Sequence, residues 1–203
     1  MSSQIKAYYQ MQIFDNNFKS IKKTRVRRAR SFVRNFIRAL YTFMSGLGYS
    51  GINTLGASVN FATIFYGCGN MGLDSAYPST SSYPTRGIRL GTSTQAVALT
   101  DYKLISEIGC GTGTGEMEYY GTWQSNQQIT TSGTQESSFD IEAIYNNNSG
   151  GSITIQEIGL YCGYQTLTQV EYVTCMLRDL VSGGQTVNDG EWIKVKYTIK
   201  ITV

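Results

Sequence analysis

The chain has 203 residues and a formal net charge of +3, and it contains no histidine. A hydrophobic fraction of 41% is enough to form a core, and the length suits one domain of moderate size. The missing histidine excludes Ser-His-Asp and Cys-His catalysis, His-ligated zinc and a histidine-based pH switch. The net charge conceals an asymmetry. Residues 1–50 carry ten basic side chains and one acidic side chain (+9), whereas residues 51–203 carry seven basic and thirteen acidic side chains (−6).

We therefore expect residues 1–50 to form a basic arm joined to a body made of residues 51–203. From about residue 31 to 45, apolar residues recur at steps of three and four, which predicts an amphipathic helix with arginines on its opposite side. The side chains that we expect to bind a partner are the arginines and apolar residues of this segment: Arg27, Arg28, Arg30, Phe32, Arg34, Phe36, Ile37, Arg38, Leu40 and Phe43.

Three interpretations of this helix compete. Its apolar face packs on its own domain or on a neighbouring subunit, or it docks on an acidic protein surface or packaged nucleic acid, or it lies on a membrane surface. A signal peptide is not expected, because Arg34 and Arg38 interrupt the apolar segment. No stretch approaches the length that a membrane-spanning helix needs.

After residue 50 the pattern predicts β-strands, because short apolar runs rich in β-branched and aromatic residues alternate with Gly, Ser, Asn and Thr clusters. Strict alternation marks the terminal strand, and a change of apolar parity in residues 152–162 predicts a bulge near Glu157 to Gly159. No helical pattern separates the strands, which favours an antiparallel β-sandwich of jelly-roll or Ig-like type. The candidate strands are residues 61–66, 87–90, 117–123, 138–145, 152–162, 174–180 and 193–203.

The sequence predicts no catalytic residue, cofactor site or metal site. The glycine-rich residues 109–115 lack the Gly-Lys-Ser/Thr ending of a phosphate-binding loop, so we expect a turn there. Cys68, Cys110, Cys162 and Cys175 form no Cys-x-x-Cys pair, and we expect them to be small buried hydrophobic residues in a reducing compartment. The acidic residues show no clustering, which favours solvation at the surface over paired-carboxylate catalysis.

Five stretches carry a resemblance to a known group of proteins. They are Gly-Ile-Arg-Leu-Gly-Thr at 87–92, Thr-Asp-Tyr-Lys-Leu at 100–104, Ile-Thr-Ile-Gln-Glu-Ile-Gly-Leu-Tyr at 153–161, Met-Leu-Arg-Asp at 176–179 and Asp-Gly-Glu-Trp-Ile-Lys-Val-Lys-Tyr-Thr-Ile at 189–199. In this pattern the chain resembles small structural proteins of tailed bacteriophages. These are packing and turn motifs, so the resemblance implies a fold and a virion context rather than an activity.

The resemblance implies a non-enzymatic virion component that is assembled in the host cytoplasm. We expect it at the head–tail connector, neck or collar, as a homo-oligomer that contacts portal, adaptor, collar or fibre subunits. In the expected mechanism, apolar helix residues insert into a groove of the partner and the arginines hold the helix against an acidic rim. Two alternatives stay open: a virion protein whose basic arm contacts packaged DNA, and a glycan-binding tail or fibre protein.

Overall fold

The structure is a computed structural model that describes residues 4–29, 32–45, 50–60, 87–131, 134–165 and 171–202. It is mainly β, and the described strands pair antiparallel except for one short parallel pair, which confirms the prediction of a mainly β protein. The candidate strand at 61–66 lies outside the described residues. The elements are β1 (Gln4–Phe14), β2 (Ser20–Lys23), β3 (Arg27–Ala29), α1 (Arg34–Ser45), β4 (Ser50–Ile52), β5 (Ser58–Asn60), β6 (Gly87–Gly91), β7 (Gly109–Cys110), β8 (Glu116–Thr131), β9 (Thr134–Asn146), β10 (Ile153–Gln165), β11 (Glu171–Val187) and β12 (Trp192–Thr202).

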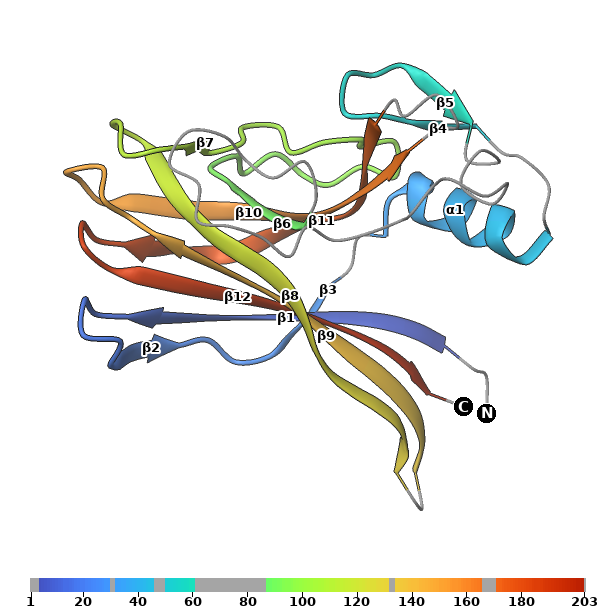
Figure 1. Cartoon of the computed structure of the whole chain (residues 1–203), viewed down its shortest axis with the longest axis horizontal. Coiled ribbons are helices and arrows are strands. Elements are labelled where there is room, and N and C mark those ends of the chain that lie inside the picture. Colours follow the sequence, from blue (N-terminus) through green and yellow to red (C-terminus); the bar gives the residue numbers. More distant parts are fainter. Residues whose placement is uncertain are drawn as a thin grey trace.

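Two sheets make up most of the described molecule (Figure 1). The large sheet has the strand order β2-β1-β12-β9-β8-β7, with β3 also paired to β1. A smaller sheet has the order β11-β10-β6, and β4 and β5 form a separate hairpin. Apolar side chains from the facing sides of the two sheets form one core, so each sheet has an inner face that is dry and an outer face.

The alternation in the terminal strand has the predicted consequence. Ile193, Val195 and Tyr197 of β12 are fully buried, whereas Lys194 and Lys196 lie on the other face and are only partly covered. The same period-2 pattern places alternate residues of β9 in the core, and β9 pairs with β12 along the length of both strands.

The structure corrects the predicted boundary between arm and body at residue 50. β1 pairs with β12 from Gln4 opposite Thr202 to Phe14 opposite Trp192, so it is an internal strand of the large sheet. The physical reason is a second period-2 pattern, in which alternate residues of β1 enter the core. The buried residues of β1 are Ala7, Tyr9, Met11 and Ile13.

The predicted parity change in β10 is also present. The register between β10 and β11 shifts between Ile155 and Glu157, next to the position that the sequence indicated. Before the shift Ile155 points into the core, and after it Ile158 does. Glu157 is therefore turned to the outer face of the small sheet, where residues 92–108 cover it.

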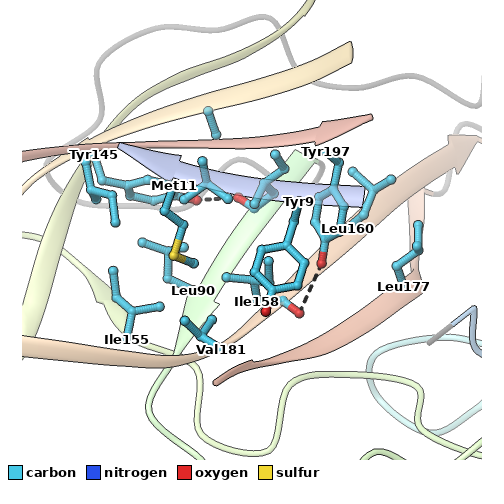
Figure 2. Packing of buried hydrophobic residues seen from close by; sticks show 14 of the residues in the cluster. Tyr9, Met11, Leu90, Tyr145, Ile155, Ile158, Leu160, Leu177, Val181 and Tyr197 are labelled. Atoms are coloured by element: carbon cyan, nitrogen blue, oxygen red, sulfur yellow. Dashed lines mark hydrogen bonds between the residues drawn. The ribbon is translucent and has the colours of Figure 1, made fainter. Parts of the chain in front are cut away.

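Three tyrosines of the large sheet reach across the core to the small sheet (Figure 2). The Tyr9 hydroxyl donates to the Leu180 carbonyl at 3.0 Å, and the Tyr145 hydroxyl donates to the Ile88 carbonyl. The Tyr197 hydroxyl donates to a carboxylate oxygen of Asp179 at 3.1 Å. These polar ends find partners inside an apolar core, so each tyrosine fixes the position of one sheet against the other.

The N-terminal part of the chain crosses from one sheet to the other. β3 pairs with β1 of the large sheet, and shortly afterwards Phe32 forms a bridge to Leu177 of β11 while the Val33 amide donates to the Met176 carbonyl at 3.1 Å. α1 follows, within the range over which the sequence predicts a helix. The buried Asn35 side chain bonds both backbone groups of Ile52, which ties the helix to β4.

We predict that Tyr197→Phe lowers the free energy of unfolding by about 1–3 kcal/mol, because Asp179 loses a buried donor. Tyr8→Phe is the matched control, since Tyr8 is only half-buried and we expect a change within about 0.5 kcal/mol. Urea unfolding followed by tryptophan fluorescence measures both. Equal stability of the two variants would contradict the role of the Tyr197 hydroxyl in joining the sheets.

Candidate functional site

A buried group of charges lies on the outer face of the small sheet. Arg178 of β11 has a fully buried side chain, and its Nε donates to Oε2 of Glu157 at 2.8 Å. Its Nη1 donates to Oδ2 of Asp101 at 2.8 Å, and Nη2 donates to the Gln95 carbonyl at 2.9 Å. Burial by itself lowers the pKa of Arg178, but the hydrogen bonds and charges of the two carboxylates outweigh it, so the guanidinium stays ionised. We call Arg178, Glu157 and Asp101 the Arg178 cluster.

The Arg178 cluster holds residues 92–108 on the small sheet. Glu157 accepts hydrogen bonds from the amides of Ser106 at 2.8 Å and Ile105 at 3.3 Å. Gly91 gives it room, because a Cβ there would lie 2.6 Å from Oε1 of Glu157 and 2.6 Å from the Ser106 carbonyl oxygen. The cluster corrects the expectation that the acidic residues are scattered at the surface, since Asp101 and Glu157 converge on one arginine.

Tyr161 extends this anchor. Its hydroxyl accepts a hydrogen bond from the Leu104 amide at 2.6 Å, and the two side chains share a small buried cluster with Cys175. Arg89 lies over the Tyr161 ring at 4.6 Å and pairs with Glu107 at 2.7 Å. Burial raises the pKa of Tyr161 far above its usual range, so the phenol stays neutral. Leu104, Tyr161 and Cys175 are buried, and this arrangement is suited to holding a fold together.

The surface has a cleft with a volume of about 780 Å³. It lies where the chain crosses between the sheets, with β3 on one rim and β11 on the other. We call it the β3–β11 cleft. Its lining residues come from five parts of the chain: Tyr9, Arg27, Arg28, Phe32, Val97, Ala98, Leu99, Asp179, Leu180 and Ser182. Burial raises the pKa of Tyr9, and the charge of Arg27 partly offsets that rise.

Apart from the cleft, a basic surface follows the outer strand of the large sheet. Its side chains are exposed and lie on β2 and the loops on either side of it. Exposed apolar side chains are interspersed, among them Phe18, Ile21 and Val26. Basic side chains on an outer strand also oppose pairing between sheet edges, which is the simplest role for them. The residues of this basic edge are Lys19, Lys22, Lys23 and Arg25.

The structure separates the side chains that the sequence predicted to act as one docking surface. Arg27 and Arg28 line the β3–β11 cleft together with Phe32. Phe32 and Phe36 stack at 4.2 Å and pack on the protein's own core, so they are not available for insertion into a partner. This corrects the expected insertion of these apolar residues into a partner. Phe32, which comes just before the helix, bridges to Leu177 of β11 instead.

The remaining predicted residues differ in exposure. Ile37 is 56% exposed and Arg34 is also exposed, while Arg38 and Leu40 are half-buried. Arg30 and the side chain of Phe43 lie outside the described residues. Only part of the predicted set therefore faces solvent, and Ile37 is the apolar member of that part.

Other motifs have structural roles. The glycine-rich loop after β7 turns back on its own chain, and the Gly113 amide donates to the Glu116 carboxylate at 3.0 Å. Cys175 is fully buried, and burial raises the pKa of its thiol; Cys68 lies outside the described residues. Within the described ranges no cluster of cysteine and carboxylate side chains is suited to a metal ion. No helix in those ranges is long and apolar enough to cross a membrane.

Comparisons of the chain with protein families, with curated proteins and with solved structures give no match. The function has to be argued from the residues and their geometry.

We predict that Arg178→Met lowers the free energy of unfolding by about 3–5 kcal/mol, because Glu157 is left as an uncompensated buried charge. Lys194→Met is the matched control. It breaks a partly exposed pair with Glu142, whose value is within about 1 kcal/mol. Limited trypsin digestion gives a second readout, since release of residues 92–108 frees the backbone around the exposed Lys103 for cleavage. Unchanged stability and unchanged cleavage in Arg178→Met would refute the anchoring role.

Proposed function

We propose that the chain is a non-enzymatic structural subunit of a tailed-bacteriophage virion, located at the head–tail connector, neck or collar. In this proposal the two sheets form a β-sandwich body, and copies of the chain assemble into a symmetric oligomer. The basic N-terminal surface, made of the basic edge and the arginines of β3, meets an acidic partner in the particle.

The observation that carries the proposal is the convergence of the motifs that resemble phage structural proteins. Gly91, Asp101, Glu157, Tyr161 and Arg178 come from separate stretches of sequence and meet around the Arg178 cluster. All of them have packing or anchoring roles. The shared pattern therefore describes a scaffold, which supports a structural protein rather than an enzyme.

The distribution of ion pairs supports an external acidic partner. Every ion pair between described side chains joins two residues of the part after residue 86. Glu107, Asp140 and Glu142 are matched in this way with Arg89, Lys196 and Lys194. These three carboxylates thus neutralise three bases of the body itself. The exposed side chains of the basic edge form no ion pair with a described carboxylate, and their positive charge faces outward, where it can steer association.

Packaged DNA is the second candidate partner, and the basic edge is the observation that favours it. Lys22, Lys23 and Arg25 are exposed within four residues of one another, as phosphate contacts require. The salt dependence separates the two partners. Binding through several phosphates collapses between low and moderate salt, whereas docking on a protein with apolar contacts persists.

We predict that mass spectrometry finds the chain in washed phage particles that encode it, at a fixed stoichiometry. The variant Lys19→Gln, Lys22→Gln, Lys23→Gln is expected to be incorporated about fivefold less, because the steering charge is lost. The control variant Lys103→Gln, Lys194→Gln, Lys196→Gln removes the same charge from the body and is expected to be incorporated normally. Absence of the chain from the particles would rule out the proposed function.

A further inference from the structure

We propose that the β3–β11 cleft binds an extended, carboxylate-bearing segment of an acidic partner protein. The inference rests on the proposed function for the identity of the partner as another virion protein. The chemistry of the cleft can be tested on the isolated chain.

The size and walls of the cleft suit a peptide. A volume of about 780 Å³ lies within the range of sites that enclose a small ligand or several side chains. Phe32, Val97 and Leu99 supply apolar contact, and Leu99 is 63% exposed although it belongs to this wall. An apolar side chain of a partner would cover Leu99 from water, which is a favourable contact.

The charge of the cleft selects a carboxylate. Arg27 lies opposite Tyr9 in the antiparallel register, so its side chain shares the inward face with Tyr9. No described carboxylate forms an ion pair with Arg27 or Arg28. Asp179 also lines the cleft and accepts a hydrogen bond from Tyr197, but it is 3% exposed, and the two arginines outnumber its single negative charge. A planar guanidinium at an opening between two sheets is well matched to a carboxylate, which it binds with two parallel hydrogen bonds.

The strands at the rims favour an extended partner. β11 is the outermost strand of the small sheet, and β1 is the one described strand that pairs with β3. The chain itself uses the β11 edge in this way, because Phe32 bridges to Leu177 next to the cleft. Outer strands recognise extended segments through backbone hydrogen bonds, while side-chain pockets supply specificity. A nucleic acid would need a row of basic side chains and stacking platforms, and the basic edge offers the former outside the cleft.

The test uses a fluorescein-labelled, terminally blocked peptide, Gly-Glu-Leu-Glu-Leu-Gly, and its Gln-for-Glu counterpart, in fluorescence anisotropy at 150 mM salt. We expect the acidic peptide to bind at least about tenfold more tightly than the neutral one. The Arg27→Gln, Arg28→Gln variant is expected to lose at least about tenfold in affinity for the acidic peptide. Lys22→Gln, Lys23→Gln removes the same charge outside the cleft, and we expect a change below about threefold because exposed charges are screened.

A second variant tests the cleft itself. Ser182 is exposed on the β11 rim, so Ser182→Trp keeps both arginines and fills the opening. We expect this variant to lose at least about tenfold in affinity with an unchanged circular dichroism spectrum. Unchanged binding by Ser182→Trp, or equal losses from the arginine and lysine variants, would overturn the inference. So would displacement of the peptide by an unlabelled oligonucleotide with a steep salt dependence, which would assign the site to nucleic acid.

The two proposals fail in different ways. If the chain is present in particles but the peptide does not bind, the cleft inference is wrong and the structural role stands. If the peptide binds in the cleft but the chain is absent from particles, the virion assignment is wrong and the binding site stands.

Discussion

A buried guanidinium sets the arrangement of the small sheet and of everything that packs on its outer face. Arg178 has no exposed side-chain surface, so its donors have to be met by acceptors inside the protein. Glu157 comes from the neighbouring strand, but Asp101 and the carbonyls of Gln95 and Ala96 belong to a distant segment. That segment must therefore lie across the sheet, because an unpaired buried charge costs several kcal/mol.

The position of that segment determines the cleft. One wall of the opening is formed by residues 97–99. They lie in the sequence between Gln95 and Asp101, which both accept hydrogen bonds from Arg178. The same segment receives the start of the helix, since the Arg34 amide donates to the Leu99 carbonyl at 2.9 Å. The Arg178 cluster thus shapes a surface that it does not itself reach.

Strands with strict alternation were predictable, and contacts between distant residues were not. The terminal strand and the parity change before Ile158 follow from local spacing, which a period of two makes visible. β1 has the same alternation, but the concentration of basic residues in the first fifty positions favoured an arm. Arg178 and Asp101 are 77 residues apart, so no local pattern joins them. The available signal was the presence of charged residues, Glu157 and Arg178, among apolar neighbours in two strands, since buried charges in a sheet require a partner.

The place where the chain crosses between the sheets explains why a partner would bind there. β3 belongs to the large sheet, and Phe32 bridges to the small sheet only a few residues later. The core tyrosines join the two sheets from inside, and the crossing joins them again at the edge. A ligand that contacts both rims of the cleft binds the folded state, in which the two sheets keep their native position relative to each other. Its binding free energy therefore adds to the stability of the folded state. Arg27 and Arg28 lie in the same crossing. Assembly through this region would couple the attachment of a partner to the rigidity of the whole body.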